Sequence, residues 1–257
     1  MDREALGGIL FRHREALPVL LSVPVIAAAL RGGGTPRAGA LLGSAVVGGG
    51  VLLRLGAVRR IGRGARVFRA HASGGLISAG PYCWTRNPLY IAAALMLCGF
   101  GLVAGAGWIA VALVPATLLA YTPVVLVEEH ALVALFGDAY RSYLAHVPRW
   151  IGFKRPYRGM SRGALVGWRE VFRREKGLVP WSIIALLAIA TARGEWLPAS
   201  RVSHRLLPAS ELGRETAVAG TAAIAVIANA VKVELHERRR LAGRAARVAS
   251  SGERRGG

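Results

Sequence analysis

Two groups of polar and aromatic residues carry the chemistry that this chain can perform. The first lies between positions 82 and 90 and the second is an acidic pair further along; together they comprise Tyr82, Arg86, Asn87, Pro88, Tyr90, Glu128 and Glu129. A helix that starts at Asn87-Pro88 would offer free backbone N–H groups to a carboxylate. The glutamates would attract an ammonium or a sulfonium, and the tyrosine rings would stack on a flat base or a cation. S-adenosylmethionine carries all of these groups, so it is a ligand that these residue types would suit.

The two groups can lie together only if the chain between them forms a hairpin. Residues 89–103 and 108–127 are apolar, and a short Ala-Gly-Ala-Gly turn separates them. A helix over residues 108–127 would be roughly 30 Å long, which returns the chain to the level of Asn87. We therefore expect the acidic pair and the first group to meet at one end of the hairpin. Pro115 and Pro123 are expected to bend its second helix.

The composition indicates a membrane protein. Hydrophobic residues make up 53% of the 257 positions, whereas soluble domains average roughly 45–50% even with glycine counted. The apolar residues cluster in six segments, which are 16–30, 38–53, 89–103, 108–127, 178–192 and 216–231. Flanking Arg, Trp and Tyr side chains can extend such segments to the length of a membrane span. We expect an all-α, polytopic membrane protein with about six transmembrane helices. Its cofactor pocket would face the cytoplasm and be formed by the hairpin and the segment after it.

The charge pattern predicts the orientation of these helices. The net charge is +20, from 34 Lys and Arg against 14 Asp and Glu, and the basic residues cluster at 54–69, 128–176 and 232–257. This alternation with weakly charged connections is typical of cytoplasmic loops and predicts that both termini are cytoplasmic. Anionic membrane lipids are the expected partners of the basic loops, and no nucleic-acid partner is expected. The sequence leaves the oligomeric state open.

Over residues 80–150 the chain resembles the isoprenylcysteine carboxyl methyltransferases and the related phospholipid N-methyltransferases. Their pattern is a Gly-Pro-Tyr opening, an Arg-His/Asn-Pro-x-Tyr motif, a two-helix hairpin, a Glu-Glu pair, a Phe-Gly-x-x-Tyr-x-x-Tyr motif and a Val-Pro-Arg close. In this chain the pattern stands as Gly80-Pro81-Tyr82, Arg86-Asn87-Pro88-Leu89-Tyr90, Glu128-Glu129, Phe136-Gly137, Tyr140, Tyr143 and Val147-Pro148-Arg149. The joint order and spacing of these pieces carry the resemblance, because each piece alone is short.

The resemblance implies an integral membrane methyltransferase that uses S-adenosylmethionine on a lipophilic or lipidated substrate. The implied cofactor-binding residues are Tyr82, Arg86, Asn87, Pro88, Tyr90, Glu128 and Glu129, and those that close the pocket or meet the substrate are Tyr140, Tyr143 and Arg149. Arg149 would orient a carboxylate acceptor, and Glu128 or Glu129 would help an amine acceptor to lose a proton. Carboxyl O-methylation of the isoprenylcysteine type is the favoured reaction, and phospholipid N-methylation is the alternative.

Two other classes of protein stay open at this point. In a membrane reductase of the sterol-reductase type, the basic stretch 59–69 would meet the 2′-phosphate of NADPH. A non-catalytic scaffold or transporter ranks last, because the ionisable residues lie at the ends of the apolar segments.

Within the methyltransferase class, Asn87 stands where histidine is common, which removes any role that needs an imidazole proton.

Four regions are expected along the chain. They are a two-span region with a basic cytoplasmic loop (1–79), the methyltransferase core (80–151), an extension with two further spans (152–237) and a basic, disordered tail (238–257). Cys83 and Cys98 show no spacing typical of a disulfide framework or a metal site, so we expect them to be structural and expect no metal.

Overall fold

The described part of the chain is entirely helical. The computed structural model describes residues 14, 16–31, 36–61, 75–152, 156–157 and 165–193. In chain order its elements are α2 (Leu17–Leu30), α3 (Arg37–Ile61), the 3-10 helix η1 (Gly80–Cys83), α5 (Pro88–Val103), α6 (Gly107–Phe136), α7 (Asp138–His146), α8 (Trp168–Arg174) and α9 (Leu178–Arg193). Because no strand occurs among these residues, the prediction of an all-α fold is confirmed for this part.

Five of the six expected apolar segments are helices, namely α2, α3, α5, α6 and α9. Two of them, α3 and α6, are long and apolar enough to cross a membrane, and the other three are shorter apolar helices. The sixth segment, 216–231, and the tail 238–257 lie outside the described residues. A total of six membrane spans and the orientation of the termini therefore stay predictions.

The helix α6 differs most from the sequence expectation. The expected helix ended at residue 127, whereas α6 continues to Phe136 and carries both glutamates in its interior. The helix is continuous through Pro115 and Pro123, and no proline or glycine follows until Gly137. Gly137 has a φ of +53°, a conformation that glycine adopts at little cost, so the chain turns there. The acidic pair consequently lies about two helical turns before the end of α6.

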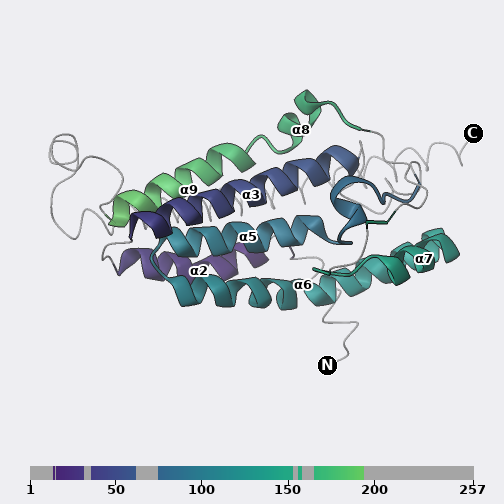
Figure 1. The fold of residues 1–257 in the computed structure, drawn as a ribbon, viewed down its shortest axis with the longest axis horizontal. Coiled ribbons are helices and arrows are strands. Elements are labelled where there is room, and N and C mark those ends of the chain that lie inside the picture. The colour runs from purple at the N-terminus through teal and green to yellow at the C-terminus, as the bar shows by residue number, and fades with distance from the viewer. Residues whose placement is uncertain are drawn as a thin grey trace, which may run out of the picture.

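The longer helices lie side by side along the long axis of the molecule (Figure 1). The backbones of α3 and α5 approach closely at two glycines, Gly43 and Gly99. A Cβ added to Gly43 would lie only 2.7 Å from the backbone oxygen of Gly99. The expected hairpin is present, since α5 turns into α6 at Gly105, whose φ is +68°. At this turn α2, α5, α6 and α9 share a buried apolar cluster that includes Val25, Leu97, Leu113 and Ile189.

The segment after α7 returns to the start of α5. The backbone N–H of Arg86 donates a hydrogen bond to the carbonyl of Pro148 at 3.0 Å, which joins the turn before α5 to residues 148–150. Further along the chain α8 packs on α3, where Val171 is fully buried against Leu55 and Val58. The described part of the extension is therefore attached to the helix that also packs against α5.

Candidate functional site

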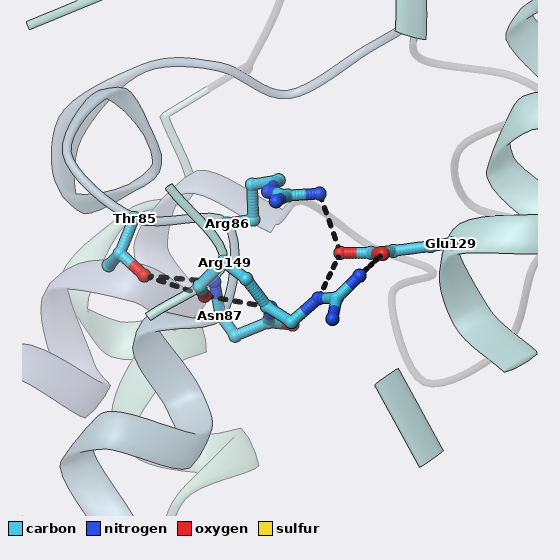
Figure 2. Close-up of polar contacts among 5 residues, drawn as sticks. All are labelled: Thr85, Arg86, Asn87, Glu129 and Arg149. Atoms are coloured by element: carbon cyan, nitrogen blue, oxygen red, sulfur yellow. Dashed lines mark hydrogen bonds and ion pairs between the residues drawn. The ribbon is translucent and has the colours of Figure 1, made fainter. Parts of the chain in front are cut away.

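The turn before α5 holds the segment after α7 in place. The side-chain amide of Asn87 donates to the carbonyl of Arg149 at 3.0 Å, and the hydroxyl of Thr85 donates to the same carbonyl at 3.2 Å. Figure 2 shows both contacts. Asn87 occupies the N-cap position of α5, as predicted, but its side chain makes no capping bond. Its side-chain N–H group is bonded across the turn, so Asn87 positions the backbone of Arg149.

Glu129 lies between two arginines beside this turn. Its Oε1 accepts hydrogen bonds from Nη1 of Arg86 at 2.7 Å and from Nε of Arg149 at 3.2 Å, and its Oε2 accepts one from Nη2 of Arg149 at 2.6 Å. Figure 2 shows both guanidinium groups turned toward this carboxylate. The Glu129 side chain is only 10% exposed. We name Arg86, Glu129 and Arg149 the arginine clamp, because they join α6 to the turn before α5 and to the segment after α7.

Glu128 has different partners, since successive residues of an α-helix point about 100° apart. Its Oε1 accepts a hydrogen bond from Nη1 of Arg14 at 2.9 Å, and the hydroxyl of Tyr90 lies 3.1 and 3.2 Å from its two oxygens. The ring of Tyr90 stacks on that of Tyr121, with the centroids 4.3 Å apart. We name Arg14, Tyr90, Tyr121 and Glu128 the Glu128 cluster. The side chains of Arg14 and Glu128 are 26% and 28% exposed, so this carboxylate is more accessible than that of Glu129.

Three further tyrosines of the predicted site are packed into the protein. Tyr140 and Tyr143 are buried in one apolar cluster with Val147, and the hydroxyl of Tyr143 donates to the carbonyl of Tyr82 at 2.7 Å. Burial raises the pKa of Tyr82, Tyr140 and Tyr143 well above the usual range of a phenol. For Tyr140 the carboxylate of Glu129 raises the pKa further. All three hydroxyl groups therefore stay protonated and neutral at physiological pH.

The structure brings half of the predicted site residues into two clusters. Arg86, Glu129 and Arg149 share the arginine clamp, while Tyr90 and Glu128 share the Glu128 cluster. The other five predicted residues lie outside both clusters. Pro88 is fully buried at the first turn of α5. The packing and hydrogen bonds described above involve the remaining four, which are Tyr82, Asn87, Tyr140 and Tyr143. Their roles toward a ligand stay predictions.

Two residues of the Glu128 cluster, Arg14 and Tyr121, were not expected from the sequence, and neither was Thr85, which bonds the carbonyl of Arg149. A signal for Tyr121 exists, because it precedes Glu128 by seven residues, or about two helical turns, and so shares its face of α6. In the sequence, Arg14 looks like any other basic residue that precedes an apolar segment. Its partner, Glu128, lies 114 positions away. No local pattern indicates that pairing.

The two clusters offer different chemistry. The Glu128 cluster combines a partly exposed carboxylate, two stacked aromatic rings and a guanidinium, a set that suits a ligand with both a cation and an anion. The arginine clamp contains two guanidinium groups and one carboxylate, which leaves one positive charge in excess. The hydrogen bond to Glu129 raises the pKa of Arg149, so that guanidinium is charged at any physiological pH.

Residues 38–139 match the family model for phospholipid methyltransferases. The matched part runs from α3 to the start of α7 and contains residues 86–90 and 128–129, while Arg14 and Arg149 lie outside it. No curated protein and no solved structure matches the chain. The family match confirms the resemblance to the isoprenylcysteine carboxyl and phospholipid methyltransferases, and with the apolar helices it indicates a membrane methyltransferase.

Proposed function

We propose that this protein is an integral membrane enzyme that transfers the methyl group of S-adenosylmethionine to a carboxylate on a lipophilic substrate of the isoprenylcysteine type. The family match and the two long apolar helices α3 and α6 support a membrane methyltransferase. One observation carries the site: the two ends of the α5–α6 hairpin meet, with Tyr90 bonded to Glu128 and Arg86 to Glu129. Residues far apart in sequence thereby form one polar region at the end of apolar helices.

The residues of the Glu128 cluster fit the charged part of this methyl donor. The carboxylate of Glu128 attracts an ammonium or sulfonium, and the ring of Tyr90, held by stacking on the buried Tyr121, would offer its π-face to a cation. When bound, the donor supplies a methyl group that is already activated for in-line displacement. The protein therefore needs to align the acceptor and exclude water, to which the buried Tyr140 and Tyr143 contribute.

The arginine clamp supports a carboxylate as the acceptor. Nε and Nη2 of Arg149 donate to Glu129, whereas the third nitrogen of the guanidinium points away from it (Figure 2). The Arg149 side chain is 33% exposed, so part of it can be reached from outside the protein. A carboxylate acceptor needs an orienting cation and no general base, and Arg149 would supply that cation.

N-methylation of a phospholipid headgroup is the second candidate reaction, and the description of the matched family supports it. An amine acceptor must lose a proton before or during methyl transfer. Glu129 is poorly suited to accept it, because both of its oxygens already accept hydrogen bonds from arginines. Glu128, which is partly exposed, would be the base in this reaction.

Methyl transfer from tritiated S-adenosylmethionine by the purified protein tests the proposal. N-acetyl-S-farnesylcysteine and phosphatidylethanolamine serve as acceptors, and the labelled products are then treated with alkali. A methyl ester releases tritiated methanol under alkali, whereas an N-methyl amine keeps its label. We expect alkali-labile label on the farnesylcysteine.

Two outcomes would contradict the proposal at different levels. Alkali-stable label on the phospholipid alone would show that the acceptor is an amine and not a carboxylate. The protein would still be a methyltransferase. No label on either acceptor, together with calorimetric binding of NADPH and not of S-adenosylmethionine, would refute the methyltransferase and support a reductase.

A further inference from the structure

One member of the Glu128 cluster comes from outside the part of the chain that matches the family. Arg14 precedes α2, and its guanidinium lies 2.9 Å from Oε1 of Glu128. The hydroxyl of Tyr121 lies 3.5 Å from the backbone oxygen of the same arginine. The side chain of Arg14 therefore lies beside Glu128 and its main chain beside Tyr121, two residues on the same face of α6.

The ion pair between Arg14 and Glu128 differs from the arginine clamp in how firmly it is held. A single short bond joins Arg14 to Glu128, whereas three bonds from two arginines hold Glu129. Both partners in the first pair are about a quarter exposed, at 26% and 28%. Because both side chains are partly exposed, a ligand that offers each of them a new partner can reach this pair and open it.

The charges determine which ligand can open the pair without penalty. A ligand that brings only a cation to Glu128 would compete with the guanidinium of Arg14 for that carboxylate and offer the guanidinium nothing in exchange. A ligand that brings only an anion to Arg14 would leave Glu128 with the hydroxyl of Tyr90 but without that counter-charge. A zwitterion replaces both partners at once, because each protein charge gains a new counter-charge.

We infer that Arg14 and Glu128 together form a zwitterion-binding subsite, in which Arg14 binds the carboxylate and Glu128 the ammonium of an α-amino acid group. The inference rests on the proposed function, since the methyl donor carries such a group. It adds a binding residue that precedes the family-matched part of the chain. It also separates the two glutamates: Glu128 meets the ligand, while Glu129 positions Arg86 and Arg149.

Calorimetric titration of the purified full-length protein with two probes tests this subsite. S-adenosylmethionine carries both charges of the amino acid group, whereas decarboxylated S-adenosylmethionine keeps the sulfonium and the ammonium but lacks the carboxylate. Arg14→Gln should lower the affinity for S-adenosylmethionine by about ten- to a hundredfold, the range of a lost charged hydrogen bond. The same substitution should not lower the affinity for the decarboxylated probe.

Two further variants complete the comparison. Arg14→Lys keeps the positive charge, so it should lose less affinity for S-adenosylmethionine than Arg14→Gln does. Arg141→Gln removes an arginine whose ion pair with Asp138 is exposed on α7, with side chains 64% and 94% accessible, and should change neither affinity. Thermal unfolding of each variant in the same detergent checks that it is folded.

The outcomes separate this inference from the proposed function. Equal losses for both probes in Arg14→Gln, or tighter binding of S-adenosylmethionine, would overturn the subsite and leave the methyltransferase standing. Wild-type protein that binds neither probe would refute both. If Arg14→Gln does not fold, the affinities of the wild-type protein for the two probes still test the inference. The inference is overturned if S-adenosylmethionine binds less than about threefold more tightly than the decarboxylated probe.

Discussion

Substitution of Gly43 by alanine tests how closely α3 and α5 pack. The added Cβ would lie 2.7 Å from the backbone oxygen of Gly99, 2.7 Å from Cγ2 of Val103 and 2.9 Å from Cβ of Leu102. Since ordinary van der Waals contact begins at 3.4 Å, the helices would have to separate by about 0.7 Å at this point. The oxygen of Gly99 belongs to the backbone of α5 and cannot rotate away, so the strain cannot be relieved by a side-chain movement.

The substitution Gly49→Ala is a matched control on the same helix. A Cβ added to Gly49 meets nothing within 4 Å. Both variants gain the preference of a helix for alanine over glycine, about 0.5–1 kcal/mol, so this contribution cancels when they are compared. The remaining difference is the cost of overpacking, which is about 1–3 kcal/mol. We expect the upper half of this range because the obstructing atom is in the backbone.

Equilibrium unfolding of the purified protein in mixed micelles, followed by circular dichroism, measures this difference. Gly43→Ala should unfold at a free energy about 2 kcal/mol lower than Gly49→Ala, which should be as stable as the wild type or slightly more stable. Equal stability of the two variants would show that α3 and α5 can separate without cost. That result would refute the argument that small residues set the distance between these helices.

Two other substitutions test the site with the same unfolding experiment. Glu129→Gln leaves Arg86 and Arg149 facing each other without a carboxylate, so we expect a loss of about 3 kcal/mol in the free energy of unfolding. Asp138→Asn removes an exposed pair and should lose less than about 0.5 kcal/mol; similar losses in both would contradict a structural role of the clamp. Asn87→Asp keeps the shape of the side chain but replaces the N–H group that donates to the carbonyl of Arg149, so it should lose about 1–3 kcal/mol. No loss would mean that the side chain acts as a helix cap, because Asp caps as well as Asn.

The hairpin could be predicted because its causes are local. Two apolar stretches with a Gly-containing turn between them fold into antiparallel helices, and the rise of an α-helix then fixes which residues lie at the same level. The predicted neighbours Tyr90 and Glu128 are indeed hydrogen-bonded. The predicted end of α6, at residue 127, was wrong, because an acidic pair resembles the polar end of an apolar helix. Backbone hydrogen bonding does not depend on side-chain polarity, and the helix continues until Gly137 permits a positive φ.

The different surroundings of Glu128 and Glu129 could not be predicted from the sequence. The two side chains are chemically identical and adjacent, so no local property distinguishes them. Their directions differ by about 100°, and what each one meets depends on the segments that pack on the two sides of α6. One side presents Arg86 and Arg149, and the other presents Arg14 and Tyr90.

The sequence by itself determined the five apolar helices, the hairpin and the resemblance to a family, because apolar length, turn residues and the order of short motifs are properties of neighbouring positions. Only the tertiary structure decided which charge meets which. The partners of the two glutamates lie between 20 and 114 positions away from them. Pairing over such separations is set by how whole helices pack against one another, and that packing is the sum of many contacts which no single stretch of sequence contains.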